Sequence, residues 1–262
     1  MALDAIGRPG PSLYHRLNPL TKVASAAVAT LGAFLIGGYV APALLFAGLV
    51  LPGALVARLL RRVVRLSLLV SLLISVSVAL VSVLTRAGAT TLFTIGPFDA
   101  TLEGVDFAGR VIVRLVVAAA ALTLFGLTTE PRALVADLER RGASPRLTFA
   151  LAATLDAIPR MIERAVVVAA AQRARGLDTE GRLLARLRGL VPLVGPVLLS
   201  SLAEVEQRSL ALDARAFGRR GPRHPVWSPP DSDRQRAVRW LLVLGLTAIL
   251  AGRAVGAVPE LP

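Results

Sequence analysis

The sequence predicts an all-α integral membrane protein with about five transmembrane helices and two long cytoplasmic helices. Hydrophobic residues make up 55% of the 262-residue chain, and the mean hydropathy is +0.66. A soluble domain usually has about 45–50% apolar residues. The apolar residues gather in stretches of the length that crosses a bilayer. The basic residues, 29 Arg and one Lys, lie mostly between those stretches.

Five apolar stretches are candidate membrane spans. The second is short and contains Pro52, so we expect it to tilt or kink. The last extends to Val258 if Arg253 is tolerated within it. The stretches are Val23–Val40, Ala43–Ala57, Leu66–Thr85, Phe107–Leu127 and Trp240–Gly252.

The distribution of basic residues predicts the orientation. Residues 1–22, 58–65 and 128–236 hold 25 of the 30 basic residues, whereas segment 86–106 has one Arg and three acidic residues. Because cytoplasmic loops carry the excess of Lys and Arg, the N-terminus is predicted to be cytoplasmic and segment 86–106 external. The first 22 residues lack the apolar core of a signal peptide. We therefore expect a multi-pass protein of the cell (plasma) membrane.

The spans predict three regions along the chain. Residues 1–127 form an N-terminal membrane part with four spans, residues 128–236 a cytoplasmic region, and residues 237–262 a C-terminal membrane helix.

The cytoplasmic region contains two long helical patterns, at 146–176 and 182–218. They are rich in Ala and Leu and are interrupted by Pro159 in the first and by Pro192 and Pro196 in the second. A helix that is apolar nearly all round must bury that surface. Either the two helices pack on each other, or they also carry a hydrophobic docking face for a membrane partner.

Both patterns end in similar short motifs. The first ends Ala174-Arg175-Gly176, and the second ends Ala214-Arg215-Ala216-Phe217-Gly218. Gly176 and Gly218 are natural C-terminal caps, and an Arg in a last helical turn also interacts favourably with the helix dipole. Each motif alone is weak, but the occurrence of both at the ends of two adjacent long helices is more specific.

Composition excludes several kinds of site. The absence of Cys rules out disulfides, zinc ribbons and Cys-ligated iron–sulfur clusters, and His15 and His224 are too few and too far apart for a His-rich metal centre. There is no phosphate-binding Gly-x-x-x-x-Gly-Lys-Ser/Thr loop and no Ser/His/Asp set that suggests catalysis. Nucleic-acid binding is disfavoured because the basic residues lie between apolar spans. We therefore expect no catalytic residue, no metal site and no cofactor.

With these features the chain resembles the transmembrane (T) component of energy-coupling factor (ECF) transporters, the EcfT/CbiQ family of ABC importers. The segment Ser12-Leu13-Tyr14-His15-Arg16-Leu17-Asn18-Pro19-Leu20-Thr21-Lys22 is similar to the family's N-terminal motif, Ser-x-Leu-His-Arg-Leu-Asp/Asn-Pro-Arg-x-Lys. Two helices that end in Ala-Arg-Gly-type motifs, and a Pro-punctuated second helix from Val191, match the family's coupling helices. Leu20 stands where the family usually has Arg, and the second motif is Ala-Arg-Ala with its Gly delayed to Gly218.

The resemblance implies a function and its partners. Two cytoplasmic ABC-type ATPase subunits would bind Arg175 and Arg215, each in its own groove, through the motifs Ala174–Gly176 and Ala214–Ala216. Apolar residues of the coupling helices would dock a separate substrate-binding membrane subunit, the S component, which selects a vitamin or a transition-metal ion. ATP hydrolysis would reside in the partners, so this chain is not expected to be an enzyme. The expected docking residues are Leu151, Leu155, Leu198 and Leu202.

Two other functions remain as alternatives. A self-sufficient secondary transporter should show two similar halves with broken helices in corresponding positions, but this chain has four spans, a long cytoplasmic block and one further span. An integral-membrane enzyme needs acidic residues, or Ser and His, clustered within its spans, and there is no acidic residue between Val23 and Thr85.

Overall fold

The computed structural model describes residues 12–86, 88, 90–95, 98–176, 183–217, 227 and 229–254. By contacts the chain divides into two compact units. We call Met1–Asp137 with Ser228–Pro262 the membrane unit, and Leu138–Trp227 the long-helix unit. This division follows contacts, so the predicted regions 1–127, 128–236 and 237–262 stay a prediction about the membrane.

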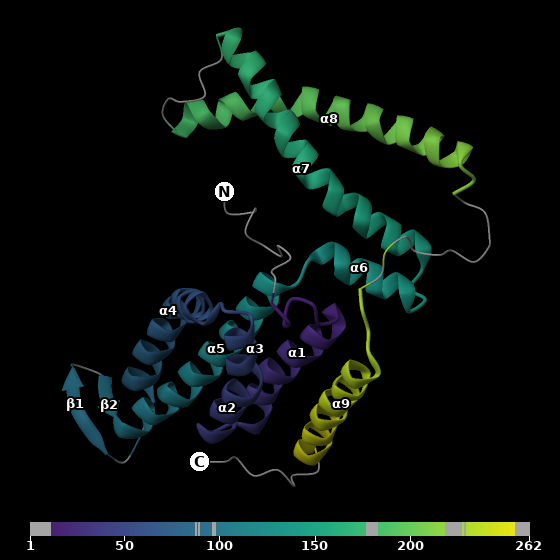
Figure 1. The fold of residues 1–262 in the computed structure, drawn as a ribbon. Coiled ribbons are helices and arrows are strands. Elements are labelled where there is room, and N and C mark those ends of the chain that lie inside the picture. Colours follow the sequence, from purple (N-terminus) through teal and green to yellow (C-terminus); the bar gives the residue numbers. More distant parts are fainter. Residues whose placement is uncertain are drawn as a thin grey trace. The chain divides into compact units, whose positions relative to one another are not determined.

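Helices make up nearly all of the described membrane unit (Figure 1). They are α1 (Pro19–Ile36), α2 (Val40–Leu45), α3 (Leu51–Val56), α4 (Leu60–Thr85), α5 (Leu102–Thr128), α6 (Pro131–Arg140) and α9 (Asp233–Ala254), with a π-helix at Phe46–Val50 between α2 and α3. Strands β1 (Thr91–Ile95) and β2 (Phe98–Thr101) form an antiparallel hairpin between α4 and α5. Residues 131–137 of α6 lie in this unit, and the last three residues of the helix belong to the other.

Four of the described helices, α1, α4, α5 and α9, are long and apolar enough to cross a membrane. The second expected span corresponds to the shorter helical segment Val40–Val56. Its middle turn widens into the π-helix just before Pro52. Because proline lacks a backbone N–H and crowds the preceding turn, a widened turn accommodates it. The all-α membrane fold class is thus confirmed.

Contacts between helix ends indicate that the described helices of this unit run five times between its two ends. Lys22 of α1 bonds to the carbonyl of Thr128, where α5 ends, and Thr101 at the start of α5 bonds to the carbonyl of Arg86, where α4 ends. Helices α1 and α4 therefore both run opposite to α5, so Val40–Val56 must return the chain between them. Helix α9 begins beside Asn18, since Gln235 accepts the Asn18 backbone N–H.

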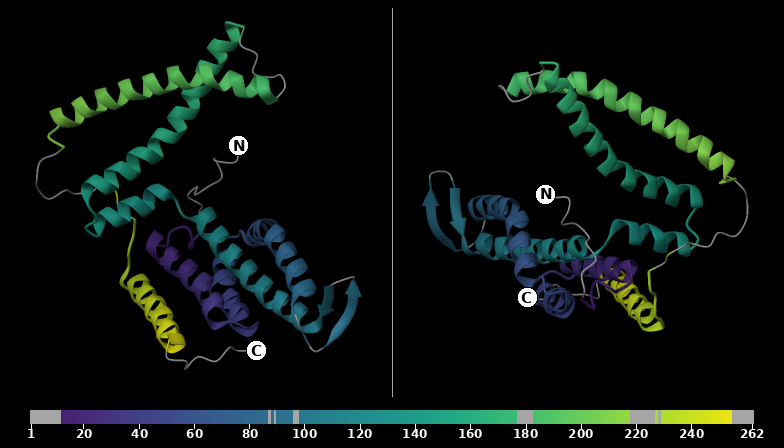
Figure 2. Two further views of the ribbon diagram at one scale, coloured as in Figure 1. Left: turned by 180° about the vertical axis from the view of Figure 1, so that it is seen from behind. Right: turned by 45° about the horizontal axis from the view of Figure 1, so that its top comes forward.

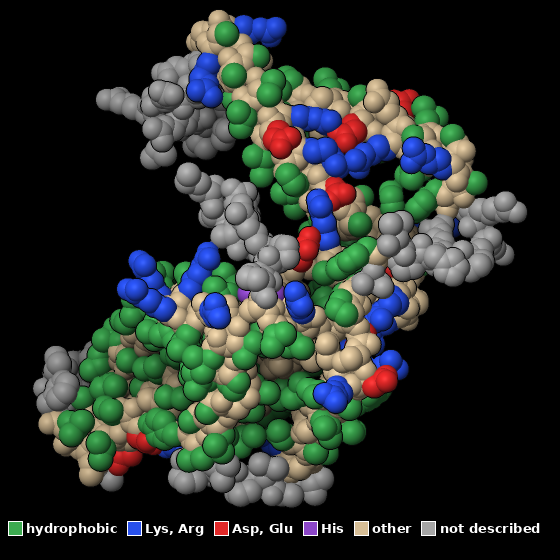
Figure 3. Space-filling view, viewed as in Figure 1, with side chains coloured by type: hydrophobic (Ala, Val, Ile, Leu, Met, Phe, Trp, Pro, Cys, Tyr) green, Lys and Arg blue, Asp and Glu red, His purple; other side chains and the backbone are tan. Residues whose placement is uncertain are grey.

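Small side chains allow the helices to approach closely. The core contains Ala29, Ala54, Ala57, Ala120 and Ala121, all at most 5% exposed. At the α4–α5 contact, a Cβ on Gly104 would lie 2.5 Å from the carbonyl oxygen of Ser82, so only glycine fits there. Small residues at interfaces are typical of membrane helices, and most large apolar side chains of α4 face outward (Figure 3).

The long-helix unit consists mainly of two helices that cross each other (Figures 1 and 2). They are α7 (Pro145–Ala174) and α8 (Leu183–Ala214), close to the two predicted patterns. The helices run antiparallel: the Phe149 ring, near the start of α7, lies 4.6 Å from the Phe217 ring, just after α8. Pro159 lies within α7 and does not end it. At 1.5 Å per residue, the 30 residues of α7 span about 45 Å.

Candidate functional site: two arginine-bearing helix ends and the N-terminal motif

The end of α7 has the predicted glycine cap. Helix α7 ends at Ala174, Arg175 is the C-cap residue, and Gly176 follows with a φ of +88°. The Gly176 N–H donates to the carbonyl of Arg173 at 3.0 Å. A left-handed glycine after the C-cap is the usual way to stop a helix, so the prediction for Gly176 is confirmed.

The end of α8 corrects the second predicted cap. The helix ends at Ala214, and Ala216, with a φ of +55°, takes the left-handed position that was assigned to Gly218. The Ala216 N–H donates to Asp213 at 2.9 Å, and the Phe217 N–H donates to Leu212 at 3.0 Å. These two bonds define a Schellman motif. Gly218 itself lies outside the described residues, and it is two residues too late to cap this helix end.

The two motifs are therefore alike in backbone geometry as well as in sequence. All six residues, Ala174 to Gly176 and Ala214 to Ala216, are exposed. Within the described part of the chain, neither the Arg175 nor the Arg215 side chain makes a hydrogen bond or an ion pair. Because α7 and α8 are antiparallel, the two guanidinium groups lie at opposite ends of the helix pair.

An ionic cluster joins α7 to α8 between these ends. The Glu204 carboxylate of α8 forms ion pairs with Arg160 and Arg164 of α7 and with Arg208 of its own helix. The Arg160 and Arg208 Nε atoms each lie 3.3 Å from Glu204 Oε1, and Arg164 also donates to the carbonyl of Ser200. One carboxylate thus holds three guanidinium groups at the contact between the helices.

The expected docking leucines lie on the surface of this helix pair. Leu151 and Leu198 are 40% and 52% exposed, Leu202 is 65% exposed, and Leu155 is half-buried. A groove of about 460 Å³ separates α7 from α8 and is lined by other residues, among them Phe149, Met161, Glu204 and Leu212. The structure thus brings none of the four leucines into the groove, and their role in binding stays a prediction.

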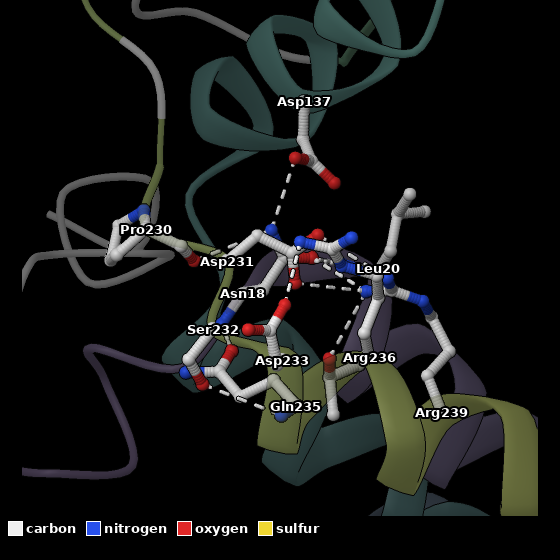
Figure 4. A network of polar contacts seen from close by, with 11 residues as sticks. Asn18, Leu20, Asp137, Pro230, Asp231, Ser232, Asp233, Gln235, Arg236 and Arg239 are labelled. Carbon is white, nitrogen blue, oxygen red and sulfur yellow. Dashed lines mark hydrogen bonds and ion pairs between the residues drawn. The ribbon is translucent and has the colours of Figure 1, made fainter.

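The N-terminal motif forms a second cluster, which joins helices that are distant in sequence (Figure 4). The Asn18 side chain is fully buried. Its Oδ1 accepts the Leu20 N–H at 3.0 Å and so caps α1. Its Nδ2 donates to Asp137 Oδ1 of α6 at 3.0 Å and to the carbonyl of Pro230 at 3.5 Å.

The same cluster holds the start of α9. The Asn18 backbone N–H donates to Gln235 Oε1 at 2.8 Å. Arg239 pairs with Asp231, with Nη2 at 3.3 Å from Oδ2, and its Nη1 lies 3.4 Å from both Asn18 Oδ1 and Thr21 Oγ1. We call Asn18, Asp137, Asp231, Gln235 and Arg239 the Asn18 cluster.

Lys22, the only lysine, completes the motif. Its side chain is buried, and its ammonium group donates to the carbonyls of His15 at 3.0 Å and Thr128 at 2.7 Å. The last carbonyls of a helix lack partners within the helix and lie at the negative end of its dipole. Lys22 therefore serves as a C-terminal cap for α5 in addition to being part of α1.

His15 lies beside this ammonium group. Its Nδ1 lies 2.6 Å from the Ser12 hydroxyl. Partial burial, and secondarily the charge of Lys22, lower the pKa of His15 below its ordinary value. A neutral ring can accept a hydrogen bond from the Ser12 hydroxyl at Nδ1, so the pKa shift and the hydrogen bond are consistent with each other.

Sequence reasoning used Asn18 and Lys22 only as parts of a motif and assigned nothing to their partners. The one available signal was the Asn-Pro step, which is typical of a helix start with Asn as N-cap and Pro in the first turn. The contacts to Asp137 and Arg239 cross 119 and 221 residues, and no local pattern announces them.

The fold and these clusters define a multi-pass helical membrane protein whose chain also forms a pair of long helices with exposed arginines at their ends. Comparison with known proteins identifies the family. The CbiQ family, described as cobalt transport protein, matches residues 10–225, and the chain belongs to this family.

Three curated relatives carry the name energy-coupling factor transporter transmembrane protein EcfT. The protein of Heliobacterium modesticaldum is 33% identical over 250 residues, which cover 90% of this chain and 93% of the relative. That of Thermosediminibacter oceani is 28% identical and covers 80% and 82% of the two chains. That of Brevibacillus brevis is 32% identical and covers 81% and 84%. The resemblance to the EcfT/CbiQ family is thereby confirmed, and the relatives are named as transporter components rather than as enzymes.

Proposed function

We propose that this chain is the coupling component of an ECF-type importer and transmits the motion of two ABC-type ATPases to a substrate-binding S component. The observation that supports this most directly is the pair of matched helix ends. Arg175 and Arg215 stand on equivalent backbone caps, are exposed, and have no side-chain partner among the described residues. If each arginine only supported its own helix, there would be no reason for both helices to end in the same exposed arginine and the same backbone cap.

Guanidinium chemistry suits the contact that we propose. The group is always charged and can donate two parallel hydrogen bonds to one carboxylate. Each arginine would enter an acidic groove on one ATPase. Since the arginines lie at opposite ends of helices about 45 Å long, one ATPase groove cannot take both. Two ATPase subunits are therefore the natural complement.

The proposed orientation places the Asn18 end of the membrane unit in the cytoplasm. Basic side chains gather where α4 begins, and acidic side chains lie toward the β1–β2 hairpin (Figure 3). Arg58, Arg61, Arg62 and Arg65 are the exposed basic residues at the start of α4, and Glu103 and Asp106 are the acidic ones at the start of α5. A positive cytoplasmic end agrees with the positive-inside rule.

The S component would take the apolar surface of α7 and α8. Leu151, Leu198 and Leu202 are exposed together with Val166, Val167, Leu199 and Val205. An exposed apolar surface of this kind marks an interaction site. The cargo, a vitamin or a transition-metal ion, would be chosen by that subunit, and the alternatives of a secondary transporter or a membrane enzyme have no comparable support in the relatives' names.

Co-purification with the ATPases tests the proposal. The tagged chain is co-expressed with a pair of ECF-type ABC ATPases, and the ATPase retained on the chain is quantified. Each lost arginine should weaken the contact by about 2–5 kcal/mol, because a groove carboxylate loses its partner. The double variant Arg175→Ala/Arg215→Ala should therefore retain almost no ATPase. Arg146→Ala, an exposed arginine at the opposite end of α7, is the matched control, and full retention by the double variant would contradict the proposal.

A further inference from the structure

The Asn18 cluster stands where the two units of the chain are joined. The chain leaves the membrane unit after Asp137 and returns to it at Ser228. Asp137 accepts a hydrogen bond from Asn18 Nδ2 at 3.0 Å. Pro230 and Asp231, just after the return, bond to Asn18 and Arg239, respectively. Both covalent connections to the long-helix unit are therefore attached to the same buried asparagine.

The attachment is buried and extensively hydrogen-bonded. Asn18 and Asp137 are fully buried, and the side chains of Asp231 and Arg239 are only 5% and 12% exposed. Asn18 uses its backbone N–H, both side-chain atoms and its carbonyl oxygen in bonds to α1, α6, the 230–231 segment and α9. A fully satisfied buried polar network holds a single arrangement.

Helix α9 is held partly by this attachment. None of its residues is buried, and among the described elements it packs mainly against α1. Its start is held through Gln235 and Arg239, and its other end through Arg253, which donates to the carbonyl of Leu35. Polar contacts at its ends thus act together with a half-buried apolar face that includes Leu242, Leu246 and Ile249 to position α9 against α1.

We propose that the Asn18 cluster is the mechanical anchor through which displacement of the long-helix unit is passed to α1 and α9. A pull on either connection reaches Asn18 directly, and Asn18 caps α1 while it holds the start of α9. Asn18 is here a positioning residue that acts through the backbone connections. That the displacement is driven by ATPases rests on the proposed function, whereas the anchoring does not.

The first experiment measures the anchor in the full chain alone, in lipid nanodiscs, by amide hydrogen exchange. Asn18→Ala should raise exchange by about tenfold at α6 and at residues 229–239 together, because both connections lose one shared buried partner. Thr101→Ala is the matched control, since Thr101 is 1% exposed and caps α5 at the other end of the unit. It should raise exchange only around the start of α5. If Asn18→Ala leaves either connection as protected as before, the anchor is refuted.

A charge exchange separates the Asn18–Asp137 link from the capping of α1. Asn18→Asp keeps an oxygen acceptor for the Leu20 N–H but sets a carboxylate against Asp137. The double variant Asn18→Asp/Asp137→Asn restores the hydrogen bond with its direction reversed. Exchange should rise in the single variant and return to within about twofold of the wild type in the double variant. Amide exchange that is as fast in the double variant as in the single variant would also refute the anchor.

The second experiment adds the ATPases and asks whether motion crosses the anchor. The chain has no Cys, so spin labels can be placed on cysteine pairs Ala170/Glu206, across α7 and α8, and Leu31/Leu244, across α1 and α9. With ATP and vanadate, both distances should change in the wild type, whereas Asn18→Ala should change only the first. An equal response of both pairs in Asn18→Ala overturns the inference. Failure of the ATPases to bind the wild-type chain contradicts the proposed function instead, and the exchange experiment then decides the anchor by itself.

Discussion

Ala216 occupies, at the end of α8, the same left-handed backbone position that Gly176 occupies at the end of α7. Their φ angles are +55° and +88°. Glycine takes this conformation without steric cost, whereas a residue with a Cβ is strained by roughly 1–2 kcal/mol. The second motif therefore preserves the geometry of the first although its sequence departs from Ala-Arg-Gly.

This relationship predicts that Ala216→Gly stabilises the end of α8. Relief of the strained φ should protect the amides of Ala216 and Phe217 by about 1 kcal/mol in hydrogen exchange. Gly176→Ala should weaken the end of α7 by a similar amount. The control is Ala214→Gly, which lies in the last helical turn and should destabilise that turn by about 1 kcal/mol. Loss of protection in Ala216→Gly would show that the cap is not strained.

A second prediction concerns the cap that Lys22 provides for α5. Lys22→Met should leave the carbonyls of His15 and Thr128 without a buried donor, at a cost of about 1–3 kcal/mol in the free energy of unfolding. Part of this cost is offset because the ammonium no longer needs to be buried. The measurement is thermal unfolding in detergent. Ser25→Ala is the control, since the Ser25 hydroxyl donates to the Lys22 carbonyl of its own helix and its loss leaves both contacts of the Lys22 ammonium in place.

A third prediction tests the ionic cluster between α7 and α8. Glu204→Gln removes the carboxylate that holds Arg160, Arg164 and Arg208. The cluster is partly exposed, so the expected loss is about 1–2 kcal/mol, between the values for surface and buried ion pairs. The loss should shrink in 0.5 M salt if screening matters. Glu206→Gln, an exposed acid on the same helix, should have no such effect on unfolding at either ionic strength.

The elements that could be predicted from the sequence are those with a local signal. Long apolar runs located α1, α4, α5 and α9. Helices α4 and α9 begin earlier than their apolar runs, at Leu60 and Asp233. Arginines can continue a helix beyond the bilayer core. Pro52 marked the interruption of the second span. The cap expected at Gly218 was wrong. Residue preference favours glycine at a helix end, but α8 ends at Ala214, so the left-handed position after the C-cap falls on Ala216.

The Asn18 cluster could not be predicted for a different reason. Its members stand in four separate segments, and each has an ordinary local interpretation. Asp137 is one acid in the amphipathic helix α6, and Arg239 is one of many arginines. Only folding shows that Asn18 lies 3.0 Å from the first and 3.4 Å from the second. Residues that would bind a partner cannot be recognised from the sequence either. The exposure of Leu198 shows an uncovered apolar side chain, but it does not show which molecule would bind there.

A fourth prediction concerns that surface. Leu198→Asp and Leu202→Asp place a charge on exposed apolar positions of α8. If the S component buries them, each charge must be desolvated without a partner, and S-component binding should fall by at least about 2 kcal/mol while ATPase binding persists. Ala203→Asp, on a different side of the same helix turn, is the control. The readout is mass spectrometry of subunits retained on the tagged chain. Retention of the S component with both leucines replaced would place the docking surface elsewhere.

The last prediction separates a docking role of the two arginines from a role within their own helices. Arg175→Lys and Arg215→Lys keep the positive charge, so an interaction with the helix dipole, worth a few tenths of a kcal/mol, would persist. Lysine lacks the planar fork that donates two parallel hydrogen bonds to one carboxylate. If each arginine docks in an ATPase groove, both single variants should therefore bind ATPase more weakly and couple ATP hydrolysis to uptake less well. The two need not be equal, since Arg175 is followed by an unstrained glycine and Arg215 by a strained alanine. Adding Ala216→Gly to Arg215→Lys should not restore coupling, because the cap does not supply the missing hydrogen bonds.

The measurement combines ATPase retention with uptake of the S component's substrate in cells. Wild-type values of both in the two lysine variants would show that the arginines act only within their own helices.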